Sequence, residues 1–263
     1  MTSVVAPSLR SPIVYPDSDG KPMSDNTKQA RWIVILFDNL LALFRGAADV
    51  FIAADLLWYP VEGEPEERAA PDVLVVFGRP KGDRGSYKQW EEGGVPVAVA
   101  FEVLSPKNSY LEMADKLDFY DRHGVEEYYI YDPDHNTLCV YVRQGTALRR
   151  VRPANGFQSP RLGIRFQLTE PEMTVFRPDG RRFLTFDELE EERLQALRRA
   201  DDARRQADEA RRQADEARQQ VEKARHRFAR LAELSRKARA GQASADELQE
   251  LEQLEAAAGA PPS

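Results

Sequence analysis

Apolar residues recur every three or four positions in two segments of the chain, which is the spacing of one face of an α-helix. The first segment predicts a helix over residues 27–44, because Asp25 or Asn26 can cap its start. Its apolar face comprises Ile33, Leu36, Phe37, Leu40, Leu41 and Phe44. The second segment predicts a helix over residues 110–123 that ends at Gly124.

Short runs of β-branched, aromatic and other apolar residues predict strands before and after the second helix. The runs cover residues 50–53, 73–77, 97–104, 127–131 and 138–142, with weaker patterns near Ile164 and Phe183. The run at 97–104 is almost continuously apolar, as in a central strand that is covered on both faces. The predicted order is α-β-β-β-α-β-β, which indicates an α/β fold.

The pattern changes to one long charged helix from about residue 188. No proline lies between Pro178 and Pro261, and the heptapeptide RRQADEA occurs twice in succession over residues 204–217. Small and apolar residues alternate there at spacings of four and three, which predicts a coiled coil. This seam comprises Ala203, Ala207, Ala210, Ala214, Ala217, Val221, Ala224, Phe228 and Leu231. We therefore expect a globular domain at 1–187, a helical coiled-coil tail at 188–258 and a disordered terminus at 259–263.

The seam of the tail is mostly alanine, which buries little apolar area, so we expect weak association through it. A single solvated helix without a partner is the alternative. Gly241 and Ser244 are typical of a helix end followed by a new N-cap. Leu248, Leu251 and Leu254 then indicate a short second helix that can fold back or pair.

The charge of the chain is unevenly distributed. Its 263 residues contain 37 Lys and Arg against 44 Asp and Glu, a net charge of −7. Residues 190–255 of the tail hold 15 basic and 16 acidic residues, so almost all of the acidic excess lies in the rest of the chain. This balance disfavours a basic nucleic-acid coat or a polybasic membrane binder. The lone Cys139 excludes an intramolecular disulfide and a cysteine zinc site, and together with the lack of a long apolar segment it indicates a soluble cytoplasmic protein.

Candidate chemistry begins with Glu102, which interrupts the apolar run of the expected central strand. A buried carboxylate is costly unless it is paired or binds a metal. If the strand at 73–77 is adjacent, Asp72 and Glu102 converge at one end of the sheet, where Mg²⁺ could hold both ionised. Lys116, on the following helix, could reach back over the pair and stabilise negative charge on a phosphate. Alternatively, Asp72 begins a strand after Pro71 and Lys116 is a surface lysine.

Three segments together resemble the Uma-type family of restriction endonucleases, a branch of the PD-(D/E)XK nuclease superfamily. They are PDVLVVFG at 71–78, SYKQWEEG at 86–93 and FEVLSPKNSYLEMADKLDFYDRHGVEEYYIYDPD at 101–134. The resemblance implies an αβββαβ core with a mixed central sheet, and Asp72 and Glu102 as ligands of Mg²⁺ or Mn²⁺. Leu104 stands where the superfamily has its lysine, and the resemblance implies that Lys116 replaces it. For the additional helix-borne acid, Asp25 and Glu62 are both open.

The leading hypothesis is a Mg²⁺-dependent endonuclease that hydrolyses DNA by metal-activated water, with Asp72, Glu102 and Lys116 as catalytic residues. A local basic rim for DNA is expected at Lys81, Arg84, Lys88 and Lys107. The alternative is a catalytically inactive nuclease fold that acts in assembly or regulation, with the coiled-coil tail binding a partner helix or a second copy of the chain. Tyr120 and Tyr128 are expected to be core aromatic residues with their hydroxyls at the surface.

Overall fold

The computed structural model describes residues 13–18, 20 and 22–258, and the chain forms two compact units, residues 1–190 and 191–263. The terminus expected to be disordered, 259–263, lies outside the described residues. Within the described part of the chain, no helix is both long enough and apolar enough to cross a membrane.

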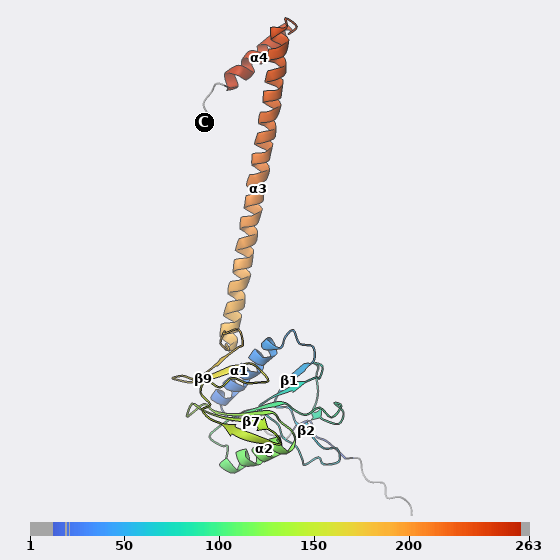
Figure 1. Ribbon diagram of the computed structural model, residues 1–263, viewed down its shortest axis with the longest axis vertical. Helices are drawn as coiled ribbons and strands as arrows, with labels where there is room; N and C mark the ends of the chain where they lie inside the picture. The colour runs from blue at the N-terminus through green and yellow to red at the C-terminus, as the bar shows by residue number, and fades with distance from the viewer. Residues whose placement is uncertain (1–12, 19, 21, 259–263) are drawn as a thin grey trace, which may run out of the picture. The chain divides into compact units, whose positions relative to one another are not determined.

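A six-stranded mixed sheet forms the centre of the first unit (Figure 1). Its strands, in sequence order, are β1 (Val50–Ala54), β3 (Val73–Phe77), β5 (Val99–Val103), β6 (Glu127–Asp132), β7 (Thr137–Gln144) and β8 (Ala147–Val151). The spatial order is β1-β3-β5-β6-β7-β8. β5 and β6 are parallel, and the other neighbouring pairs are antiparallel. The crossover between the parallel strands is the helix α2 (Tyr110–Arg122).

The helix α1 (Thr27–Leu43) precedes this sheet and completes the αβββαβ order, α1-β1-β3-β5-α2-β6. The expected α/β class and mixed central sheet are thereby confirmed. Four elements were not predicted. They are β8, a short parallel pair of β2 (Trp58–Tyr59) with β4 (Tyr87–Lys88), and β10 (Met173–Phe176) of the hairpin with β9 (Arg165–Leu168).

The strand expected near Phe183 is reduced to a single antiparallel bridge between Arg182 and Phe176 of β10, and Phe183 itself lies outside any strand. Phe183 is 6% exposed and belongs to the core that α1 covers. Its backbone N–H donates to the carbonyl of Val175 at 2.7 Å. The apolar pattern there therefore reflects burial of a loop beside the hairpin.

The two helices of the first unit cover opposite faces of the sheet because side chains alternate along each strand. Val73 and Val75 of β3 pack in the cluster that contains Trp32, Ile33, Leu36 and Leu40 of α1. Leu74 and Val76 pack in the other cluster, with Phe119 and Tyr120 of α2. The sheet is thus covered on both faces at β3 and β5, as the apolar run at 97–104 predicts.

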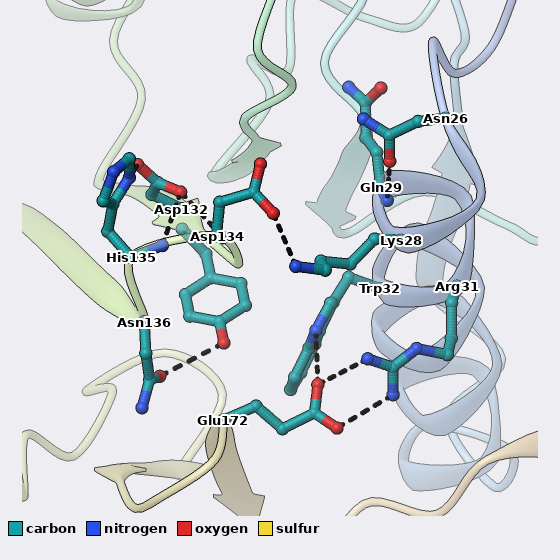
Figure 2. Close-up of polar contacts among 11 residues, drawn as sticks. Asn26, Lys28, Gln29, Arg31, Trp32, Asp132, Asp134, His135, Asn136 and Glu172 are labelled. Atoms are coloured by element: carbon teal, nitrogen blue, oxygen red, sulfur yellow. Dashed lines mark hydrogen bonds and ion pairs between the residues drawn. The ribbon is translucent and has the colours of Figure 1, made fainter.

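Polar contacts fix the start of α1 against the sheet and the hairpin (Figure 2). The Asn26 side chain caps the helix by accepting from the N–H of Gln29 at 2.9 Å. Glu172, just before β10, accepts from Arg31 and from the indole N–H of Trp32. Lys28 pairs with Asp134 in the turn after β6. Trp32 is therefore buried, while the charged residues beside it bind loops.

A buried asparagine ties α1 to the segment that leads into the tail. Asn39, which is 0% exposed, donates to the carbonyls of Ile35 at 2.8 Å and Leu184 at 2.7 Å. Its Oδ1 accepts from the N–H of Leu184 at 3.0 Å. The asparagine therefore satisfies both backbone groups of Leu184 inside the core.

The tail contains α3 (Phe186–Arg239) and α4 (Ala245–Ala258). α3 ends before Gly241, whose φ of 69° lies in the left-handed region, and Ser244 caps α4 through the N–H of Glu247. Ion pairs Arg230–Glu250 and Lys237–Glu247, both between the two helices, show that α4 folds back on the end of α3. The seam itself is solvent-exposed in the single chain as far as Phe228. The coiled coil stays a prediction.

Candidate active site

A buried carboxylate, Glu102, lies near the end of β5 and is only 3% exposed. Two donors bind it, one on each oxygen. The Lys116 ammonium donates to Oε2 at 2.7 Å, and the Tyr120 hydroxyl donates to Oε1 at 2.6 Å. A carboxylate at this depth is stable because both of its oxygens are hydrogen-bonded.

Both donors come from α2, whose start is fixed by the Ser109 cap on the N–H of Glu112. Lys116 and Tyr120 are four residues apart, so they lie on the same face of the helix. Burial alone would lower the pKa of the Lys116 ammonium, but the charge and hydrogen bond of Glu102 raise the pKa above its usual value. Lys116 is therefore a cation over the usual pH range, held against a buried anion.

Asp72 faces Glu102 across the sheet. The antiparallel register pairs Val73 with Phe101, which places Asp72 opposite Glu102. Oδ2 of Asp72 accepts from the N–H of Val103 at 2.6 Å. Burial raises the pKa of Asp72 to about 8, and the negative charge of Glu102 adds to the rise. The two carboxylates therefore repel each other.

A third carboxylate, Asp55, follows β1 and lies beside Asp72. Its N–H donates to the carbonyl of Asp72 at 3.3 Å, and its charge further raises the pKa of Asp72. The backbone of Asp55 has a φ of 50°, a left-handed conformation that aspartate tolerates better than most residues. The ends of β1, β3 and β5 thus bring three acidic residues to one edge of the sheet.

These residues line a pocket of about 1030 Å³. Acidic side chains outnumber basic ones around it. The acidic residues are Asp25, Asp55, Glu67, Asp72, Glu102, Glu112, Asp115 and Asp118, and the basic ones are Arg68, Lys107, Lys116 and Arg122. Such a pocket attracts cations and, without them, repels a polyanion.

The donor set fits a hard divalent cation. Asp72 and Glu102 offer oxygen only, and Oδ1 of Asp72 receives no hydrogen bond from any described residue. The raised pKa of Asp72 means that a proton or another cation relieves the repulsion. The described chain has no group of three or more His, Cys, Asp and Glu residues that could hold a metal. Mg²⁺ is commonly bound by one or two carboxylates, with water molecules completing its coordination shell.

Of the four residues expected to form a basic rim, only Lys107 lines the pocket. Lys81 donates to the carbonyls of Phe44 and Arg45 at the end of α1. Arg84 is bound to Glu92 at 2.6 Å and lies over the ring of Phe51. Lys88 pairs with Glu91 and lies near the ring of Tyr15. The structure thus gives Lys81, Arg84 and Lys88 local partners away from the pocket.

Lys107 belongs to a small polar network at the mouth of the pocket. Asp25 accepts from Ser105 Oγ and from Lys107 Nζ, each at 2.8 Å. Gln29 of α1 accepts from the N–H of Asp25 and donates to the carbonyl of Val103 at 2.8 Å. Of the two open candidates for the additional acid, Asp25 lines the pocket and Glu62 does not.

Sequence reasoning missed the roles of two tyrosines and Asp55. The hydroxyls of Tyr120 and Tyr128 were expected at the surface, but both are buried. Tyr120 binds Glu102, whereas the Tyr128 hydroxyl has no hydrogen-bond partner among the described residues. The four-residue spacing from Lys116 could have indicated Tyr120, since it repeats one helix face.

The comparisons with known proteins concern the same part of the chain. Residues 18–175, which is more than half of it, match the model of the Uma2 family, described as "Putative restriction endonuclease". No curated protein matches the chain.

Among solved structures, the chain is similar to one from Anabaena variabilis ATCC 29413, described as a "putative nuclease belonging to DUF820". The two are 15% identical, with a TM-score of 0.41. The match covers 53% of this chain and 75% of the other.

Proposed function

Because the chain belongs to the Uma2 family of restriction endonuclease-like proteins, we propose that it is a nuclease that uses Mg²⁺ or Mn²⁺ to hydrolyse phosphodiester bonds of DNA. The observation that supports this most is the pair Asp72 and Glu102 on facing strands, with Lys116 bound to Glu102. Asp72 and Glu102 are the proposed metal ligands. Lys116 is the proposed catalytic cation.

The replacement of the usual lysine by Leu104 is compatible with this function. The ammonium of Lys116 reaches Glu102 from α2, whereas the usual lysine would reach it from the position of Leu104, directly after β5. A cation beside a reacting phosphate needs only the right position, because its effect is electrostatic. Leu104 therefore gives no reason to prefer an inactive fold.

Each part of the proposed site has a defined task. The metal, when bound, would lower the pKa of a water molecule and polarise the phosphate. Asp72 and Glu102 would hold the metal, and the Lys116 ammonium would stabilise negative charge that develops on the phosphate oxygens. Lys107, 74% exposed at the mouth, would contact the DNA backbone.

The acidic lining of the pocket bears on affinity. With carboxylates in excess around the proposed catalytic residues, we propose that DNA binds weakly unless the metal is present. Binding then depends on divalent cation as well as on salt.

Cleavage of supercoiled plasmid with Mn²⁺ or Mg²⁺ tests the proposal. We expect nicked and linear products with the wild type and a loss of at least 100-fold in rate for Glu102→Gln. Asp118→Asn is the matched control. Asp118 also lines the pocket, but its side chain is 74% exposed and, among the described residues, its ion pair is with Arg122 on the same helix. Equal cleavage by wild type and Glu102→Gln contradicts the assignment. A wild type that neither cleaves DNA nor binds a divalent metal favours the role in assembly or regulation.

A further inference from the structure

The Tyr120 hydroxyl binds Glu102 from inside the protein, whereas Lys116 binds it from the pocket side. Tyr120 is 0% exposed, and the Lys116 side chain is 23% exposed and lines the pocket. The hydroxyl lies 2.6 Å from Oε1 of Glu102. This short distance is typical of a neutral hydroxyl that donates to a carboxylate.

The position of that hydroxyl is set by the packing of its ring. The Tyr120 ring lies parallel to Trp58 with centroids 6.4 Å apart. It meets Phe119 edge-on at 5.7 Å and Tyr128 at 4.7 Å. Burial and the charge of Glu102 raise the pKa of Tyr120 well above its usual value, so the hydroxyl keeps its proton as a donor. The ring and its donor are therefore held in place by aromatic neighbours.

A glutamate carboxylate has little orientational preference of its own, because its terminal torsion is broad and two-fold. One hydrogen bond leaves it free to rotate about that torsion, whereas a donor on each oxygen fixes its plane. The Lys116 donor is attached to a flexible, partly exposed stem, so Tyr120 supplies the rigid contact.

We propose that Tyr120 is a positioning residue: its buried hydroxyl fixes the Glu102 carboxylate in the orientation that binds the divalent cation. The inference rests on the proposed nuclease function. Groups that hydrogen-bond to metal ligands typically change metal affinity by about 10- to 100-fold when removed. Loss of the hydroxyl should therefore weaken metal binding even where the fold is kept.

Isothermal titration of the full-length, metal-free protein with Mn²⁺ tests this. We expect Tyr120→Phe to raise the dissociation constant about 10-fold or more over the wild type. Tyr128→Phe is the matched control, because it removes a buried hydroxyl from a neighbouring ring that has no partner in the described structure. That variant should bind Mn²⁺ within about two-fold of the wild type.

The outcomes separate the two proposals. If the wild type binds Mn²⁺ and Tyr120→Phe binds it with the same dissociation constant, the positioning role is overturned and the proposed nuclease function is unaffected. Equal weakening by both variants also overturns it, because the effect is then one of core packing. A wild type that binds no Mn²⁺ overturns the proposed function and this inference together.

A spectroscopic readout does not depend on the stability of Tyr120→Phe. Titration of the wild type with Mg²⁺, which does not absorb in the near ultraviolet, should produce a tyrosine difference spectrum as the acceptor of Tyr120 gains a cation. The same spectrum should appear in Tyr128→Phe and vanish in Glu102→Gln. Binding of Mg²⁺ without a tyrosine signal contradicts the proposal.

Discussion

Asp72→Asn should stabilise the metal-free protein at high pH, although it removes a proposed ligand. Asp72 is a buried carboxyl that Glu102 opposes, with a pKa raised to about 8. Asparagine keeps an oxygen that can accept from the N–H of Val103, so the hydrogen bond of 2.6 Å can remain. What the substitution removes is the charge.

The size of the effect follows from the pKa. One pKa unit corresponds to about 1.4 kcal/mol, so a rise from 3.8 to about 8 gives an upper limit of about 6 kcal/mol. We expect about half of this limit, since Asp72 lines a pocket and solvent there can screen its charge. The loss of stability caused by the Asp72 charge is absent well below pH 4, where the carboxyl is protonated in both the folded and the unfolded protein. It grows as pH rises and is complete above about pH 8, where the folded carboxyl also ionises.

Urea denaturation of wild type and Asp72→Asn in chelator at pH 5, 7 and 9 measures this. The gain in free energy of unfolding should increase steadily, to about 3 kcal/mol at pH 9. Comparison at each pH cancels the other titrating groups. Saturating Mn²⁺ should stabilise the wild type at pH 9 and not the variant. A gain that is constant with pH, or that shrinks as pH rises, refutes the reasoning.

Three further predictions concern other parts of the chain. Asn39→Ala should lower the free energy of unfolding by about 2 to 4 kcal/mol in urea, because it leaves both backbone groups of Leu184 without a partner, and a loss below about 1 kcal/mol contradicts this. Lys107→Ala should weaken DNA binding, measured by fluorescence anisotropy, and should reduce the slope of the logarithm of the binding constant against the logarithm of salt concentration by about one. Lys88→Ala should change neither the affinity nor the slope. Ala214→Glu should reduce the mass of the assembly that the full-length protein forms, measured by light scattering, and a wild type that is already monomeric rules out self-association through the tail.

The sequence was sufficient for the parts of the site that depend on local pattern. Glu102 stands out because it interrupts an apolar strand, and helix periodicity places Lys116 where it can reach back. Their approach to Asp72 required only that the two strands be neighbours, which the register of Val73 with Phe101 provides. The likeness of three segments to one family supported the same residues.

The remaining features depend on contacts between distant segments, which no local pattern encodes. Asp55 reaches the site because β1 pairs with β3, and the short run after β1 carries no signal of that register. Arg84 was expected to face DNA because it is basic. Glu92, its ion-pair partner, lies nearby in the sequence, but the ring of Phe51 comes from β1, and together they leave the Arg84 side chain 13% exposed. A charged residue in a sequence predicts that its side chain has a polar partner or faces solvent, but it does not identify that partner.

The backbone of Val103 connects the site to the rest of the domain. Its N–H is bound to Asp72, which directly precedes β3, and its carbonyl is bound to Gln29 from α1. The amide nitrogen of Val103 therefore reports on the ionisation of Asp72, and the amide nitrogen of Leu104, which is bonded to the Val103 carbonyl, reports on the docking of α1. In an NMR titration, the Val103 amide should shift with the protonation of Asp72 and again when a cation replaces the proton. It is a built-in probe of the site that needs no label attached to a side chain.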